Sequence, residues 1–136
     1  MAAFNKFNVF TAALANKVHD LSSDQITVAL SSTAPTAGMA NLAALTGEIA
    51  YTNLSARNVT TTSSTQTGGV YSLVLEDLVL TASGAVATFR YVAIYNSTVA
   101  GGGLIGWYDY GSDVTMSNLE TFSIDLTVAQ TLFDIT

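Results

Sequence analysis

Few residues in this chain could do acid–base or metal chemistry. His19 is the only histidine, and the chain has no cysteine. A zinc site would have to take nearly all its ligands from carboxylates, which is uncommon. A serine hydrolase would need His19 as its base, yet the sequence has no Gly-x-Ser-x-Gly turn to present a nucleophile. We therefore expect His19 to be structural or solvent-exposed, and we expect no enzyme, cofactor or metal site.

The acidic residues do not pair in a way that indicates catalysis. Glu76 and Asp77 are adjacent, so on a strand they would point to opposite faces, and we expect them to mark a bend between two strands. Asp109 and Asp113 flank Gly111 and could share a calcium ion through a loop. The alternative, which we favour, is a turn closed by hydrogen bonds from backbone amides to an aspartate side chain.

Arg90 has the least ordinary surroundings among the basic residues, because Phe89 and Tyr91 flank it in an otherwise apolar run. A buried guanidinium without a partner would be costly. It must therefore pair with a carboxylate, lie against an aromatic ring or emerge at a subunit boundary. We favour an ion pair inside the fold, with a pair between subunits as the alternative.

Three aromatic residues near the middle of the chain, Trp107, Tyr108 and Tyr110, could form a platform on which sugar rings stack. They fall within the pattern of a central strand, however. Packing in the core or at an interface is therefore the interpretation that we favour over ligand binding.

Residues 86–111 must position these side chains, because they form two apolar, aromatic-rich runs joined by a polar and glycine linker. The pattern predicts a β-hairpin at the centre of a sheet. In the first run, Phe89, Tyr91, Ala93 and Tyr95 fall on one face and Val86, Val92 and Ile94 on the other; in the second, Leu104, Tyr108 and Tyr110 fall on one face and Ile105 and Trp107 on the other. Since neither face of the first strand has the pattern of a fully solvated face, we expect something to cover both.

The remaining pattern predicts one helix and a series of strands. Phe7, Phe10, Leu14 and Val18 recur at helical spacing, which predicts a short helix over residues 8–17. A polar turn follows at 20–24, and residues 32–54, with the sole proline, form a long loop with a helical turn near 41–45. Strands are predicted at 26–30, 56–62, 70–75, 78–82, 88–95, 104–110, 120–126 and 132–135, with breaks at 68–69, 83–84, 101–103 and 111–113 where glycine permits turns.

These elements predict an all-β protein, a jelly-roll-like antiparallel β-sandwich of about eight strands with one short N-terminal helix. Residues 1–136 would form a single domain, in which 1–20 are an N-terminal arm and helix. The start of the chain resembles a signal peptide only weakly, because Asn5, Lys6 and Asn8 interrupt its apolar stretch. No apolar run reaches the ~18 residues of a membrane span, so we expect neither export nor a membrane partner.

The composition indicates a protein that packs against other subunits. Charged residues make up 10% of the chain, hydrophobic residues 49%, and the net charge is -6. With 13 serines and 19 threonines, the surface is polar without being charged. Such a surface suits packing against copies of the same chain. The acidic balance argues against binding to nucleic acid, whose affinity for proteins comes mainly from basic side chains.

Several segments of the chain form a recognisable pattern when they are taken in order. They are Phe89-Arg90-Tyr91-Val92, Tyr95-Asn96 and Leu104-Ile105-Gly106-Trp107-Tyr108-Asp109-Tyr110-Gly111, with Phe4-Asn5-Lys6-Phe7, residues 17–24 followed by the strand 26–30, and Glu120-Thr121-Phe122-Ser123-Ile124-Asp125 beside them. This pattern resembles a widespread family of small tailed-bacteriophage virion proteins. Together the segments span nearly the whole chain. Some members of the family look like capsid cement, or decoration, proteins.

The resemblance implies a virion structural protein, made in the cytoplasm of a host bacterium. We expect a capsid decoration protein that binds the outer shell, stabilises it, contacts the major capsid protein or other virion proteins, and self-associates as a homotrimer. Apolar residues outside the regular strands, and the unusual residues of the central hairpin, are the expected subunit contacts: Phe4, Phe7, Phe10, Leu42, Leu45, Arg90, Trp107 and Tyr108. The alternatives are a tail or baseplate component, and a carbohydrate-binding β-sandwich with Trp107 and Tyr108 as its platform.

Overall fold

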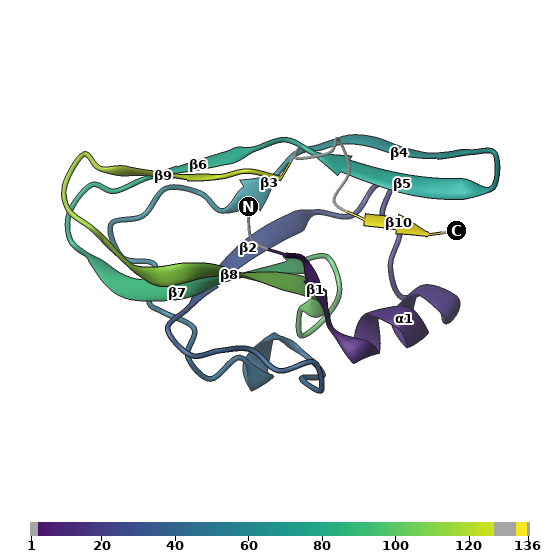
Figure 1. The fold of residues 1–136 in the computed structure, drawn as a ribbon, viewed down its shortest axis with the longest axis horizontal. Coiled ribbons are helices and arrows are strands. Elements are labelled where there is room, and N and C mark those ends of the chain that lie inside the picture. Colours follow the sequence, from purple (N-terminus) through teal and green to yellow (C-terminus); the bar gives the residue numbers. More distant parts are fainter. Residues whose placement is uncertain (1–2, 127–132, 136) are drawn as a thin grey trace.

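The protein is a sandwich of antiparallel β-sheets (Figure 1). The structure is a computed structural model that describes residues 3–126 and 133–135. Its helices are α1 (Asn8–Ala15) and the 3-10 turn η1 (Leu42–Ala44); its strands are β1 (Asn5–Lys6), β2 (Ile26–Ser31), β3 (Asn58–Val59), β4 (Thr61–Thr67), β5 (Val70–Leu75), β6 (Leu78–Thr81), β7 (Val86–Asn96), β8 (Gly103–Met116), β9 (Thr121–Ile124) and β10 (Phe133–Ile135). The predicted all-β class with one short N-terminal helix is confirmed.

The strands divide into a five-stranded sheet in the order β1-β8-β7-β2-β3, a three-stranded sheet β10-β5-β4 and a two-stranded sheet β6-β9. Figure 1 shows the smaller sheets along one side of the molecule and β2, β7 and β8 along the other, with α1 and the loop before β3 beyond them. In the part of the chain that the structure describes, no helix is long and apolar enough to cross a membrane.

Most predicted strands are found where the sequence pattern places them, with two corrections. The strand predicted at 56–62 is divided between β3 and β4, which belong to different sheets. The strand predicted at 104–110 continues to Met116, so Gly111 does not end it. Gly111 has φ 97° and lies within an irregular part of the β7-β8 ladder, where glycine allows the strand to bulge and continue. The prediction at 132–135 includes one residue outside the described part of the chain.

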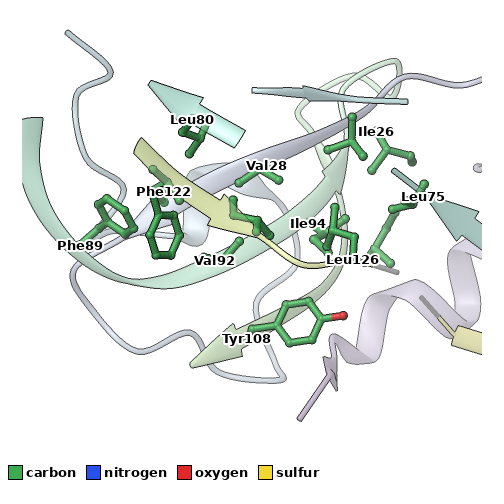
Figure 2. Packing of buried hydrophobic residues seen from close by; sticks show 14 of the residues in the cluster. Ile26, Val28, Leu75, Leu80, Phe89, Val92, Ile94, Tyr108, Phe122 and Leu126 are labelled. Atoms are coloured by element: carbon green, nitrogen blue, oxygen red, sulfur yellow. The ribbon is translucent and has the colours of Figure 1, made fainter. Parts of the chain in front are cut away.

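The main core lies between the five-stranded sheet and the two smaller sheets (Figure 2). Among its residues are Ile26, Val28, Leu75, Leu80, Phe89, Val92, Ile94, Tyr108, Phe122 and Leu126. Fully burying such a side chain stabilises a fold by ~1.5–3 kcal/mol relative to leaving it exposed. The core therefore holds the two layers together.

A second apolar cluster lies on the opposite face of β2, β7 and β8. It contains Phe7, Ala29, Leu45, Ala93, Tyr95 and Leu104, with Val9, Met39, Leu42 and Trp107 packed against it. Because the arm, α1 and the loop with η1 supply the outer residues, these segments form the cover of this face. The expectation that both faces of the hairpin are covered is confirmed.

Bulges in the hairpin overturn two predicted face assignments. Phe89 packs in the main core with Val92 and Ile94, although strict alternation would place it on the other face. The pairing register shifts between Phe89 and Tyr91, so alternation does not hold across that step. Strand β8 shows the same effect in residues 104–108.

In β8 the irregularity lies between the partners of Ile94 and Tyr95, which are Gly106 and Leu104. Ile105 is the extra residue between them. Ile105 and Tyr108 consequently share the main core, although the predicted alternation separates them.

Helix α1 is shorter than predicted. It ends at Ala15, and Lys17 adopts a left-handed conformation with φ 63°. Phe10 is buried as expected, but Val18 is 44% exposed. Including Val18 in the apolar stripe was wrong, because the helix ends three residues before it. The helical turn predicted near 41–45 is confirmed by η1.

The central strand β2 is completely buried, and its outer edge needs hydrogen-bond partners beyond the short strand β3. The loop before β3 supplies them. The Val28 amide donates to the Arg57 carbonyl at 3.0 Å, and the Arg57 guanidinium donates to the Val28 carbonyl. The Leu30 amide donates to the Tyr51 hydroxyl at 3.0 Å, and the Ile49 amide donates to the Leu30 carbonyl at 3.0 Å.

Tyr51 is the centre of this edge. Its hydroxyl also donates to Glu48 at 2.6 Å, and the Arg57 guanidinium lies 3.5 Å above its ring. Burial and the hydrogen bond to Glu48 raise the pKa of Tyr51 well above its ordinary value. The hydroxyl therefore stays protonated and serves both neighbours at once.

We expect Tyr51→Phe to lower the free energy of unfolding by ~1–3 kcal/mol, because the buried Leu30 amide loses its acceptor. Urea denaturation at neutral pH measures the change. Tyr91→Phe is the matched control, since no described residue hydrogen-bonds to the Tyr91 hydroxyl. Equal losses in the two variants would show that Tyr51 does not close the edge of β2.

Candidate functional site

Half of the predicted subunit contacts are core residues of this chain. Phe7 is 0%, Phe10 2%, Leu45 3% and Tyr108 8% exposed. Side chains so deeply buried have no surface left for a partner. Their assignment as contacts is corrected here: Phe7 and Leu45 cover the second face of the sheet, and Phe10 and Tyr108 belong to the main core.

The N-terminal arm is held against its own chain. Asn5 and Lys6 pair with Trp107 and Gly106 of β8, and the Phe7 amide donates to the Ile105 carbonyl at 3.1 Å. A side chain on Gly106 would overlap the Phe4 ring and the Asn5 carbonyl, so glycine lets the arm lie close to the strand. Phe4, Leu42 and Trp107 keep partial exposure and remain candidate contacts.

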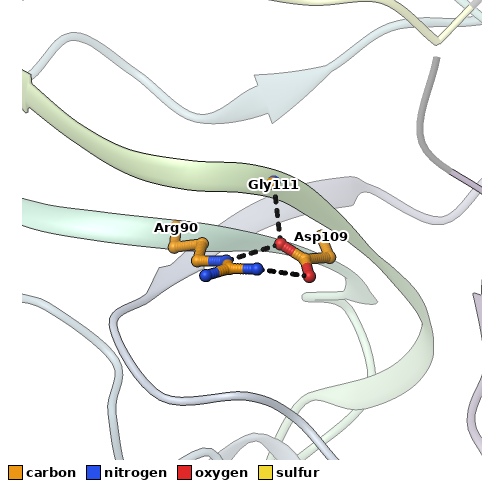
Figure 3. Close-up of polar contacts among 3 residues, drawn as sticks. All are labelled: Arg90, Asp109 and Gly111. Carbon is orange, nitrogen blue, oxygen red and sulfur yellow. Dashed lines mark hydrogen bonds and ion pairs between the residues drawn. The ribbon is translucent and has the colours of Figure 1, made fainter.

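Arg90 forms an ion pair inside the fold, as predicted (Figure 3). Its Nε lies 2.8 Å from Oδ1 of Asp109 and its Nη2 lies 3.0 Å from Oδ2. The pair is partly exposed, with 36% and 42% of the two side chains accessible. The hydrogen bonds from Arg90, followed by one from the Gly111 amide at 2.8 Å, hold the pKa of Asp109 below its ordinary value.

The hydrogen bond from Gly111 also confirms the aspartate-closed turn that we favoured over a calcium loop. Asp109 already accepts from Arg90 and Gly111, so both its oxygens are used. Within residues 3–126 and 133–135, no three His, Asp or Glu side chains come together as a metal site would require. Glu76 and Asp77 lie between β5 and β6, which confirms their predicted place between two strands.

Trp107 and Tyr108 pack within the fold, as the favoured interpretation predicts, and do not form the alternative platform for sugar rings. Trp107 packs in the second cluster against Phe7, with ring centroids 4.6 Å apart. Tyr108 lies in the main core, where burial first and the charge of Asp125 second raise its pKa to about 12. Since the two rings lie on opposite faces of β8, they cannot stack on one sugar.

His19 is structural. Its Nδ1 lies 3.0 Å from Nδ2 of Asn96, which also donates to Asp24 Oδ2 at 2.6 Å. Asn96 is completely buried at the end of β7. Sequence reasoning missed this arrangement. Asn96 is distant from His19 in the chain, and Asp24 looks like an ordinary polar residue of a turn. The only local signal is an asparagine at the end of an apolar strand.

A groove of about 980 Å³ lies beside His19. Its lining combines apolar residues of the α1 end and the β7-β8 turn, such as Leu14 and Val99, with polar residues such as Asp24, Ser64 and Tyr71. Nucleophile, base and orienting group are not assembled there, because His19 uses Nδ1 toward Asn96 and its Nε2 is buried.

Exposed apolar side chains are associated with β6 and β9. Val79 on β6 is 53% exposed, Tyr110 is 55% exposed, and Leu119 in the turn before β9 is 79% exposed. Tyr110 contacts Phe122 of β9 edge-on, with centroids 5.1 Å apart. These three side chains do not form one surface, because Val79 pairs with Ser123 and so points away from the face that carries Phe122. In the sequence they look like ordinary residues of strands and turns.

Comparison with protein-family models, with curated proteins and with solved structures finds no match to the chain. Its function must therefore be inferred from the chain's own residues and from the resemblance described above.

We expect Phe7→Ala to lower the free energy of unfolding of the dilute protein by about 3–5 kcal/mol, as in other cores. The loss follows from removing a fully buried ring that packs on Trp107. Denaturation at several protein concentrations measures it. Phe4→Ala, at a partly exposed position, is the control and should lower the free energy of unfolding by less. If only self-association changed, with stability intact, Phe7 would be a contact residue after all.

Proposed function

We propose that this protein is a non-enzymatic structural protein of a bacteriophage virion, and that it decorates the outer surface of the capsid. The resemblance to small virion proteins supports this role. So does a weakly charged, Ser/Thr-rich chain that exposes several large apolar side chains. The proposed partners are other copies of the chain and the shell protein.

The observation that carries the proposal is Leu119. It is 79% exposed and has φ 70°, a left-handed conformation that a leucine rarely adopts. Two hydrogen bonds hold the turn: the Leu119 amide donates to Ala82 at 2.8 Å, and the Glu120 amide donates to Ser117 at 3.0 Å. A strained backbone that presents an apolar side chain to solvent is typical of a functional position.

The basic residues support a location away from the packaged genome. The chain has four, and two of them are engaged within the fold: Arg57 with Tyr51 and Val28, and Arg90 with Asp109. Lys6 hydrogen-bonds to Thr11 at 2.6 Å. Cations already paired inside a protein contribute little to binding phosphate, and a net charge of -6 opposes it.

The proposed mechanism is the burial of apolar and Ser/Thr-rich surface across junctions between shell subunits. A typical interface buries ~800 Å² on each partner. Individual contacts need not be strong, because an oligomer that binds at several points gains avidity from its linked contacts. The shell would then resist internal pressure better.

Quantitative mass spectrometry of particles purified from the source phage tests the location. We expect hundreds of copies per particle, in fixed ratio to the major shell protein, because decoration follows the shell lattice. A few copies would favour the tail or baseplate alternative. Absence from the particles would contradict both virion roles.

We expect Leu119→Gly to weaken binding to particles made without the protein by at least about tenfold, which corresponds to ~1.4 kcal/mol. Its free energy of unfolding should stay within ~1 kcal/mol of the original, since relief of strain offsets the entropy that glycine adds. Co-sedimentation measures binding.

Lys17→Gly is the matched control, because Lys17 is also left-handed and follows α1, far from β6 and β9 in Figure 1. It should bind like the original protein. Undiminished binding by Leu119→Gly would remove the main support for a contact at Leu119.

A further inference from the structure

His19 contacts helix α1 and both strands at one end of the β7-β8 hairpin. Its ring centroid lies 5.3 Å from that of Phe10 in α1. Its Nδ1 lies 3.0 Å from Nδ2 of Asn96 at the end of β7. Its Cε1 is so close to Gly103, the first residue of β8, that a side chain there would overlap it. The segment that carries His19 is thus wedged against the end of the β7-β8 hairpin.

The hydrogen bonds of Asn96 determine its orientation. Its side-chain oxygen accepts from the Thr98 amide at 3.0 Å, and its nitrogen donates to Asp24 Oδ2 at 2.6 Å. A reversed amide would face both partners with the wrong atom. The second N–H of Asn96 therefore points to His19, and Nδ1 of His19 must be an acceptor.

Neutral histidine with its proton on Nε2 is the form that fits this arrangement. Protonation would turn Nδ1 into a donor facing the donor of Asn96. Nε2 is buried, and no described residue hydrogen-bonds to it, so the added charge gains no acceptor there. Asp24 Oδ2 is already occupied, because it accepts from Asn96 and from the Asp20 amide at 2.9 Å.

The charged and titratable groups around His19 come from a few segments. Lys17 precedes it on the same segment, Asp20 and Asp24 follow it, and Tyr71 of β5 lines the same groove. The lining residues from α1 and from the β7-β8 turn are uncharged. Burial lowers the pKa of His19 below 6.5, and the charge of Asp24 opposes this effect without overcoming it.

We propose that His19 is an acid-sensitive latch: while neutral it holds residues 16–25, between α1 and β2, against the β7-β8 hairpin, and its protonation releases them. This conformational device goes beyond the proposed virion role and does not depend on it. It rests on the fixed orientation of the Asn96 side-chain amide and on the burial of Nε2 of His19.

The sign of the pH effect follows from linkage. The latched state binds the proton less readily than the open state, in which His19 has an ordinary pKa near 6.5. The latch is therefore fully effective above pH ~6.5. It weakens as the pH falls through the lower pKa that His19 has in the latched state. Ordinary carboxyl groups titrate near pH ~4, so His19 dominates between pH ~5 and ~6.5.

Nuclear magnetic resonance on the intact protein tests the latch. The ring protons of His19 need no assignment strategy, because it is the only histidine. We expect its titration midpoint below 6.5. Amide protection factors for residues 16–25 should fall by up to about tenfold per pH unit within the window, since opening takes up one proton. Amides of β7 should keep their protection.

Two variants separate the latch from general acid sensitivity. His19→Asn offers an acceptor to Asn96 without titrating in this range, so its protection of residues 16–25 should not depend on pH between 5 and 6.5. Asp24→Asn keeps an acceptor for Asn96 but removes the charge, so the His19 midpoint and the loss of protection should both move to lower pH.

A midpoint at or above 6.5 in the original protein would overturn the proposal. So would a titration of His19 that leaves the protection of residues 16–25 unchanged, or the same pH response in His19→Asn. Because the first two readouts use the unsubstituted chain, the test stands even where a variant fails to fold.

Discussion

The fold depends on three adjacent strands, β2, β7 and β8, that pack against other segments on both faces. A sheet of this kind needs two covers, since each exposed face would leave large side chains in water. The smaller sheets supply one cover and enclose the main core. The arm, α1 and the loop with η1 supply the other, so segments that look peripheral in the sequence are structural parts of the sandwich.

The same constraint explains how β2 is held. Its short partner β3 contacts Ile26 and Thr27, and the remaining edge lies beneath the loop before β3. Arg57 and Tyr51 complete the hydrogen bonds that a buried strand requires, because an unpaired backbone amide or carbonyl in the core is costly. Although the chain has few charges, the guanidinium of Arg57, one of its two arginines, thus hydrogen-bonds to its own backbone.

The ionisable side chains that could take part in chemistry likewise bind to other groups of the same chain. Arg90 and Asp109 neutralise each other and close a turn, while His19 is fixed by Asn96 and Asp24. What remains outward is a polar, weakly charged surface with a few exposed apolar side chains, of which Leu119 is the most strained. The ionisable groups thus bind one another within the chain while a few apolar side chains stay exposed, and this arrangement supports the proposal of assembly over catalysis.

Local pattern was sufficient to predict the all-β class, the short helix, strands β2 and β5, and the Arg90 ion pair, because periodicity and the cost of an unpaired charge act within one segment. It could not predict the faces of Phe89 and Ile105 or the continuation past Gly111, because each bulge changes the alternation according to the register of the partner strand. Nor could it predict that Phe7 and Leu45 are core residues or that Asn96 orients His19. Burial and hydrogen bonding at these positions depend on residues distant in sequence, and the tertiary structure alone brings them together.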